Sequence, residues 1–225
     1  MRAFRKLTIA ALVLLNVGIA DAQASRGFKD SWFWGLKAGG LLYQVVDNGQ
    51  AKNPFALLGG ADWMITRTNG GLYLSFDHSF FHTDSLFVND SLSPLDSVPR
   101  VVQLRGLRRF TLMGLLFPMQ SFVFHPYIGL GVTLSSIVEA TPQGTYRNST
   151  QQNLVLNTIE AFRSTATPTF MLGMQMRMPL RGSLFGQATV TPANNNFFLF
   201  SGQGFRVTAE VGIRLNAGSS VERTR

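Results

Sequence analysis

The stretch from Phe205 to Leu215 reads FRVTAEVGIRL and alternates strictly between apolar residues and other residues. Six apolar residues share one row, and the second row carries Arg206, Glu210 and Arg214. A period of two predicts a β-strand with two different faces. At about 3.3 Å per residue, a run of this length reaches roughly 36 Å, which suits a tilted strand that crosses a membrane. The charged face predicts either a soluble sandwich strand or a barrel strand with lipid outside and a polar lumen inside.

Seven further stretches alternate in a similar way, so the chain is predicted to form eight strands. The predicted strands are 31–43, 54–66, 71–82, 101–117, 122–138, 165–178, 183–191 and 205–215. The connections between them alternate between long and short: 44–53, 67–70, 83–100, 118–121, 139–163, 179–182 and 193–203. Short turns at one end and long loops at the other are typical of up-and-down membrane barrels, whereas Greek-key sandwiches have no reason to alternate. The sequence therefore predicts an all-β, eight-stranded, antiparallel up-and-down transmembrane barrel with short periplasmic turns and long extracellular loops.

The charged residues of the predicted strands lie off the apolar rows. They form one predicted lumen-facing cluster: Lys37, Asp62, Asp77, Arg109, Arg177, Arg206, Glu210 and Arg214. An arginine that faces lipid at the middle of the membrane costs ~2–4 kcal/mol, which favours the lumen for these side chains. Eight strands enclose an interior just wide enough for side chains to fill. We therefore expect the charges to pair with one another and to plug the lumen.

Alternation alone does not say which face of the sheet is inside. In a soluble barrel or sandwich, the rows of Phe, Met and Leu would form the core and the arginines would lie at the surface. Aromatic residues near strand ends favour lipid around the barrel, because such residues collect at membrane interfaces. These residues are Trp32, Trp34, Trp63 and Tyr127.

The N-terminal residues have the layout of a secretory signal peptide. A basic start precedes the apolar run 7–20, and small residues follow at Ala22 and Ala24. We expect export across the inner membrane of a Gram-negative cell and residence in the cell outer membrane, with cleavage after Ala24 and Ala22 as the alternative. The predicted organisation is a signal peptide over 1–24, a barrel domain over 25–216 and a short periplasmic tail over 217–225.

Composition limits the partners that the chain can have. Its formal net charge is +8, but the arginines are scattered singly and no basic run or stripe occurs, so we expect no nucleic-acid partner. The chain has no cysteine, so an exported protein of this sequence needs a large core or a closed hydrogen-bond ladder instead of disulfides.

Histidines on the third predicted strand are the nearest candidates for a metal or catalytic site. His78 and His82 lie about 13 Å apart along a strand, which is too far for both to hold one ion without further ligands. Asp77, His78 and Ser79 could suggest a nucleophile and its base, but neighbouring strand residues point to opposite faces. We expect no metal, no cofactor and no catalytic residue.

The run Pro126 to Gly131 (PYIGLG) and the alternating last strand resemble the small eight-stranded outer-membrane barrels. This class includes OmpA-type transmembrane domains and the OmpX and OmpW families. The resemblance implies a monomer surrounded by outer-membrane lipid and inserted by the barrel-assembly machinery. Because the lumen is expected to be filled, we expect a structural or surface-interaction role, with loops 83–100 and 139–163 as the contact surface for a ligand. Two alternatives stay open: a narrow channel for small or apolar solutes, as in OmpW, and an enzyme that modifies outer-membrane lipid.

Overall fold

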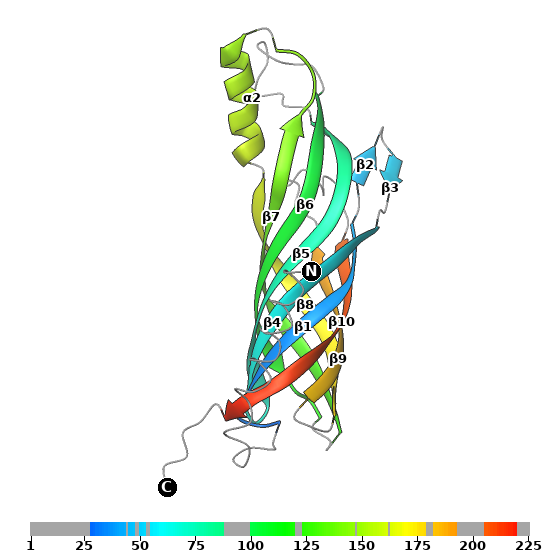
Figure 1. The fold of residues 1–225 in the computed structure, drawn as a ribbon, viewed down its shortest axis with the longest axis vertical. Helices are drawn as coiled ribbons and strands as arrows, with labels where there is room; N and C mark the ends of the chain where they lie inside the picture. The colour runs from blue at the N-terminus through cyan, green and yellow to red at the C-terminus, as the bar shows by residue number, and fades with distance from the viewer. Residues whose placement is uncertain are drawn as a thin grey trace, which may run out of the picture.

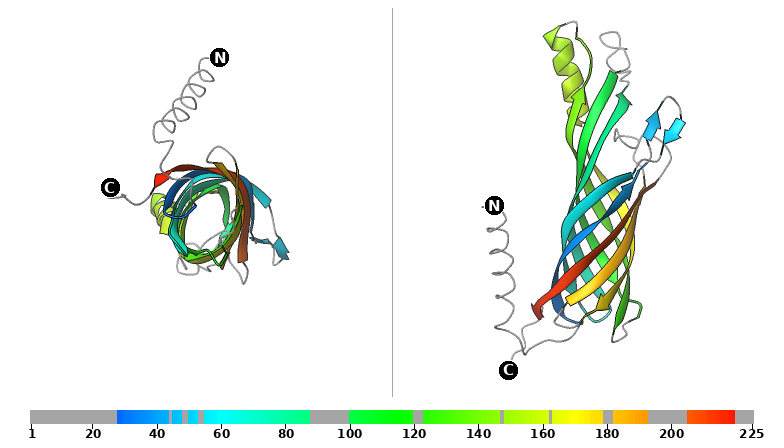
Figure 2. Two further views of the ribbon diagram at one scale, coloured as in Figure 1. Left: turned by 90° about the horizontal axis from the view of Figure 1, so that it is seen from below. Right: turned by 45° about the vertical axis from the view of Figure 1, so that its right-hand side comes forward.

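Eight long antiparallel strands close into a barrel (Figure 1), and the view along the axis shows a complete ring (Figure 2). The computed structural model describes residues 28–43, 45–47, 50–52, 55–87, 100–119, 123–146, 148–161, 163–178, 182–192 and 205–219. The barrel strands are β1 (Ser31–Leu42), β4 (Phe55–Thr66), β5 (Gly70–Phe87), β6 (Arg100–Leu116), β7 (Phe124–Pro142), β8 (Ser164–Arg177), β9 (Gly182–Pro192) and β10 (Phe205–Ser219). Each strand pairs with the next barrel strand along the chain, and β1 pairs with β10. The predicted all-β up-and-down barrel is confirmed.

The apolar rows lie on the outside of the barrel. Leu36, Leu130 and Phe205 are 73%, 66% and 66% exposed, although each lies in the middle or at the start of a strand. Polar residues of the opposite rows, such as Thr133 and Thr208, are buried inside. The alternative with the Phe, Met and Leu rows in a soluble core is therefore wrong for this fold.

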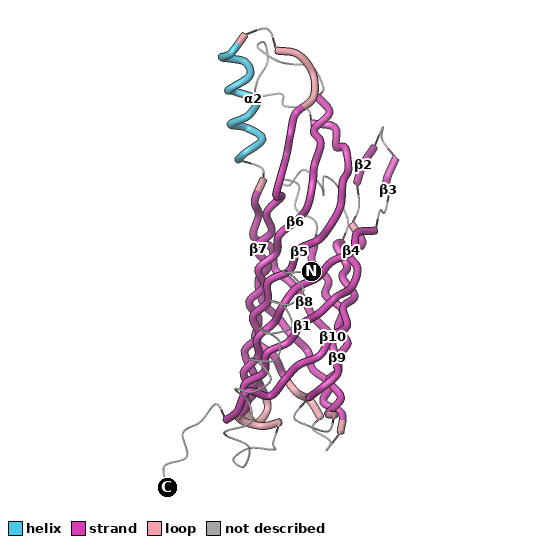
Figure 3. Tube along the Cα trace, in the orientation of Figure 1, coloured by secondary structure: helices cyan, strands magenta, loops and turns pink. Residues whose placement is uncertain are grey.

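Several strands are longer than the sequence predicts, and Figure 3 shows how three of them rise beyond the rest of the barrel. The strands β5 and β7 continue to Phe87 and Pro142, past the predicted ends at 82 and 138. Backbone hydrogen bonds to β6 extend both strands through sequence that reads as polar loop. At the opposite end of the barrel, β10 runs to Ser219, four residues beyond its predicted end and into the predicted tail.

The predicted loops contain secondary structure of their own. A two-stranded hairpin, β2 (Val45–Asp47) with β3 (Gln50–Lys52), forms part of the connection 44–53. The helix α2 (Ser149–Ala161) lies inside 139–163, so the prediction of a structureless loop there is wrong. Of the loop 83–100, residues 88–99 lie outside the described residues, as do the predicted signal peptide and residues 220–225.

The helix α2 lies beside the upper end of β7 (Figure 1). Asn148 caps it by accepting a hydrogen bond from the Gln151 backbone N–H at 2.8 Å. Val155 and Ile159 lie one turn apart and are buried in an apolar cluster with inward-facing strand residues such as Leu104. The helix therefore packs as a lid on the inner face of the extended strands. No helix in the described ranges is long and apolar enough to cross a membrane.

The interior of the barrel changes character along its axis. Beneath α2 lies the apolar cluster, which includes Leu41, Leu58, Val102, Leu104, Leu107 and Ile137. Polar and charged side chains fill the middle. A second apolar cluster lies towards the short-turn end: Phe28, Phe33, Met64, Tyr73, Met113, Leu115, Phe117, Tyr127 and Met171. Phe28 lies just before β1, and its side chain belongs to this cluster at the short-turn end of the barrel.

Candidate functional site: a charged network across the lumen

The structure brings seven of the eight predicted cluster residues into the buried interior. These are Lys37, Asp62, Asp77, Arg109, Arg206, Glu210 and Arg214, and none is more than 6% exposed. They come from β1, β4, β5, β6 and β10, because each lies on the inward row of its strand. Arg177 lies apart: it is the last residue of β8, at the short-turn end, and is only half-buried.

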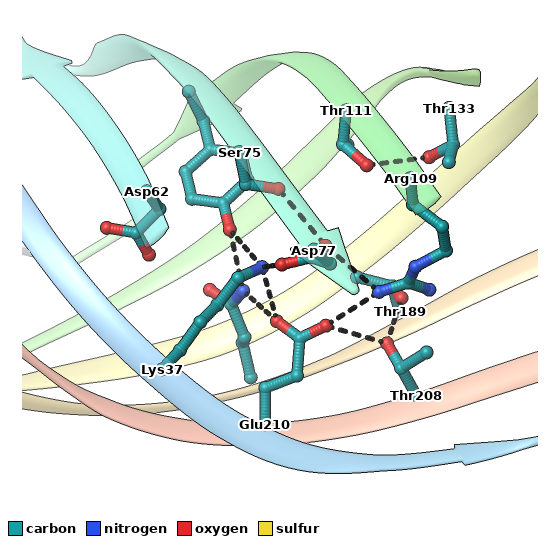
Figure 4. A network of polar contacts seen from close by, with 12 residues as sticks. Lys37, Asp62, Ser75, Asp77, Arg109, Thr111, Thr133, Thr189, Thr208 and Glu210 are labelled. Carbon is teal, nitrogen blue, oxygen red and sulfur yellow. Dashed lines mark hydrogen bonds and ion pairs between the residues drawn. The ribbon is translucent and has the colours of Figure 1, made fainter. Parts of the chain in front are cut away.

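Four of these residues form a closed ring of ion pairs (Figure 4). Lys37 Nζ lies 2.8 Å from an oxygen of Asp77 and 2.8 Å from one of Glu210. Arg109 Nη2 lies 3.1 Å from Asp77 and 2.9 Å from Glu210. Cations and carboxylates alternate around the ring, so each charge touches two of opposite sign. This arrangement offsets the cost of removing four charges from water.

One contact of the ring joins opposite walls of the barrel. Going round the closed sheet, β6 is four strands from β10 in either direction. Arg109 of β6 nevertheless lies within 2.9 Å of Glu210 of β10. The side chains therefore bridge the full width of the lumen at this level.

A second ion pair lies closer to the short-turn end. Arg214 is fully buried and binds Asp62 through two nitrogens, with Nη2 2.8 Å and Nε 3.1 Å from carboxylate oxygens. Its Nη1 donates to the Gln175 side chain at 3.0 Å. The guanidinium carbon also lies 3.7 Å from the centre of the Phe185 ring, which is a cation–π contact.

Neutral side chains join the two ion-pair groups into one network. Gln187 donates to Glu210 at 2.7 Å and to the hydroxyl of Tyr73 at 2.8 Å, while its carbonyl oxygen accepts from Arg214 at 3.0 Å and from Tyr127 at 2.9 Å. Gln187 and Tyr73 are uncharged and do not belong to the predicted charged cluster. Alternation predicts an inward Tyr73, because Tyr73 lies four residues from Asp77 on the same strand. Gln187 also faces inward, because it lies directly opposite Glu210 on the neighbouring strand.

Tyr127 needs a correction. Its place near a strand end predicts an aromatic residue at the membrane interface, but Tyr127 is 1% exposed and lies inside the barrel. Trp32 and Trp34 do lie on the outer wall, 36% and 58% exposed, and Trp63 contacts both. Alternation within PYIGLG places Tyr127 inward and Ile128 outward. For Tyr127, alternation therefore predicts the direction of the side chain better than its position near a strand end does.

Hydroxyl groups surround the ion-pair ring (Figure 4). A row of threonine side chains connects four neighbouring strands: Thr111, Thr133, Thr169 and Thr191. The Thr189 and Thr208 hydroxyls are also hydrogen-bonded to each other. Arg206 donates to Ser135 at 3.3 Å and to Thr167 at 3.1 Å. Hydroxyl contacts thus extend the polar interior beyond the charged side chains.

The catalytic and metal candidates of β5 are not brought together. Ser79 is fully buried inside the barrel, whereas His78 lies half-exposed on the outer wall, as the alternation predicts. The His82 ring accepts a hydrogen bond from Arg105 at 3.1 Å. Among the described residues, no group of three or more His, Cys, Asp or Glu side chains is placed to hold a metal ion.

Comparison with solved structures places this geometry in a class of proteins. The structure of Neisserial surface protein A superposes with a TM-score of 0.51 at 7% sequence identity, over 84% of this chain and 99% of that one. OprG from Pseudomonas aeruginosa gives a TM-score of 0.47 at 12% identity, over 84% and 95% of the chains, and Ail of Yersinia pestis gives 0.40 at 9%, over 83% and 98%. The fold is that of the small outer-membrane β-barrels, which confirms the resemblance predicted from the sequence at the level of fold. No family model and no curated protein sequence matches the chain.

Proposed function

We propose that this chain is an outer-membrane barrel protein whose lumen is closed by charged side chains, and that it acts structurally or through surface contacts at its long-loop end. The contact between Arg109 and Glu210 carries the proposal, because it joins opposite walls inside the barrel. Apolar clusters also lie above and below this level of the interior. A wide aqueous pore is incompatible with such packing.

The outer wall supports a place in a membrane. On β7 the outward residues from Phe124 to Leu134 are all apolar, and Ser136 follows. Ten steps of about 3.3 Å along a strand tilted by about 40° give a height of roughly 25 Å, which matches the apolar band of outer-membrane barrels. We use the name apolar belt for this band of outward residues around the barrel.

The long-loop end supports a role in surface contacts. The strands β5, β6 and β7 continue past the apolar belt, and α2 lies at their tip (Figure 1). The outward face of α2 presents Gln152, Asn153 and Asn157, all exposed. A rigid polar surface on extended strands is a suitable platform for a ligand outside the cell.

Gel mobility tests the membrane part of the proposal. The outer-membrane fraction, extracted in detergent, should contain the protein as a band that migrates faster without boiling than after boiling. Such a shift reports a closed barrel that resists detergent. Recovery in the soluble periplasmic fraction, without a shift, would overturn the proposal.

Single-channel recording tests the closed lumen and separates it from the narrow-channel alternative. The purified barrel should show no conductance steps in a planar bilayer. The double variant Arg109→Ala with Glu210→Ala removes one cation and one anion of the ring and leaves Lys37 paired with Asp77, so it should conduct. The matched control is Arg105→Ala with Glu139→Ala, an exposed pair 3.9 Å apart on the outer wall, which should stay closed. Steady conductance of the unmodified barrel would instead support a channel.

A further inference from the structure

A polar row crosses the outer wall on the side where the strands are longest. His78 of β5 lies directly opposite Arg108 of β6, Arg108 lies opposite Ser136 of β7, and Ser136 lies opposite Ser164 of β8. All four side chains are half-exposed or exposed. The two serine hydroxyls are hydrogen-bonded at 3.0 Å. We call these four residues the outer polar row.

The outer polar row follows the upper edge of the apolar belt. Two residues below it on the same strands lie Phe76, Phe110 and Leu134, which face outward in register with one another. Phe80, two residues beyond His78, is 64% exposed and packs edge-on against the His78 ring at 4.6 Å between ring centres. In the proposed membrane placement, a cation at this edge is at the depth of lipid headgroups.

Arg108 is the one strong charge of this row, and it is not engaged. Its side chain makes no ion pair or hydrogen bond with any other residue that the structure describes. Arg105 differs: its guanidinium contacts His82 and lies 3.9 Å from Glu139. Asp77 next to His78 is buried inside, and the exposed acidic residues Asp84 and Glu139 lie further towards the long-loop end. Neither is in register with Arg108.

A bulge separates the two arginines. Gly106 adopts a φ of 63°, and the pairing with β5 shifts between Ser79 and His82. The shift reverses the alternation, so Arg105 and Arg108, three residues apart, both face outward. A Cβ at Gly106 would lie 3.3 Å from the His78 ring, so the glycine leaves room for this ring beside Arg108.

We propose that Arg108, with His78 on one side and Ser136 on the other, binds the phosphate group of an anionic lipid in the outer leaflet. A guanidinium offers paired N–H donors that match phosphate oxygens, and the serine hydroxyls add further donors. The acyl chains of the same lipid would lie on Phe76, Phe110 and Leu134. This inference rests on the proposed place of the barrel in the outer membrane.

Native mass spectrometry of the full mature chain, folded in detergent, tests the site. Diphosphoryl lipid A is the anionic probe, phosphatidylcholine is the zwitterionic comparison and inorganic phosphate is the free anion. We expect bound lipid A to fall about fivefold in Arg108→Gln. Phosphatidylcholine binding should not change, and inorganic phosphate should not compete at the same phosphate concentration. Lipid A binding by the unmodified chain should weaken as NaCl is raised, because the contact is exposed to screening.

Two arginine variants serve as matched controls. Arg67→Gln removes the same charge at the short-turn end, where Arg67 lies 3.5 Å from Asp30, and should bind lipid A like the unmodified chain. Arg105→Gln removes an arginine already engaged by Glu139 and should lose less than half of the binding. Equal binding by Arg108→Gln, equal loss in all three variants, or full competition by inorganic phosphate would overturn the lipid site. Each variant is first checked for the mobility shift of a closed barrel, so failure of the barrel itself is seen separately.

Discussion

Arg214 and Asp62 meet inside the barrel across the backbone of Gly35, although their strands are not neighbours. Gly35 of β1 is in register with Arg214 of β10 on one side and with Asp62 of β4 on the other. A Cβ at residue 35 would overlap the Asp62 carboxylate and lie 2.8 Å from Cγ of Arg214. The missing side chain of Gly35 therefore creates the space in which the ion pair forms.

Replacing Gly35 with alanine should destabilise the barrel. The added methyl group has to displace the ion pair or the backbone, which costs about 1–3 kcal/mol in a filled interior. The free energy of unfolding, measured by urea titration of the barrel in lipid vesicles, should fall by this amount. Gly186→Ala is the matched control, because nothing lies within 4 Å of a Cβ at Gly186. Equal effects of the two substitutions would contradict the crowding at Gly35.

Removing both members of the Arg214–Asp62 pair should cost less than the two single losses added together. Asp62→Asn or Arg214→Met leaves the partner buried without its counter-charge, at a cost of about 3–5 kcal/mol each. In the double variant the loss should be smaller than the sum of the two single losses by about 0.5–3 kcal/mol. The same urea titration measures this coupling. Additive losses would mean that the two residues stabilise the barrel independently.

The lid helix should be separable from the barrel. Ile159→Asp places a carboxylate in the apolar cluster beneath α2 and should release the helix, raising the rate of trypsin cleavage at Arg163 by about tenfold. The closed barrel should keep its mobility shift on unboiled gels. Leu156→Asp is the control, because Leu156 is 39% exposed on α2. The idea of an independent lid fails if Ile159→Asp abolishes the mobility shift, or if both variants are cleaved alike.

A charged residue introduced into the apolar belt should destabilise the barrel in a bilayer. Leu130 is 66% exposed on β7, so Leu130→Arg would be harmless on a surface in water. Facing lipid, the same change should make folding into vesicles less favourable by ~2–4 kcal/mol. Gln152→Arg, on the exposed face of α2, is the control and should change it little. Indistinguishable folding of the two variants would argue that Leu130 does not face lipid.

Local alternation was enough to predict most of the interior charges. Glu210 and Arg214 are four residues apart on one strand, so they must share a face wherever the strand lies. Alternation could not predict that Arg177 is only half-buried at the short-turn end, because this depends on where β8 ends. It also could not predict the bulge at Gly106, where the change of phase turns Arg105 outward.

Long-range pairing decided the remaining features. The helix α2 has only a few apolar residues, so its sequence gives a weak periodic signal, and its burial depends on strands that extend beneath it. The strand extensions themselves depend on hydrogen bonds between β5, β6 and β7, which a polar sequence does not reveal.

The sequence by itself determined the number of barrel strands, their order of long and short connections and the two faces of each strand, because these follow from period-two alternation along a continuous chain. Only the tertiary structure decided which charges meet. The register of each pair of strands sets the height of every side chain, and closure of the sheet brings opposite walls within contact. Arg109 and Glu210 are 101 residues apart in the chain and 2.9 Å apart in the lumen, and no local pattern encodes that distance.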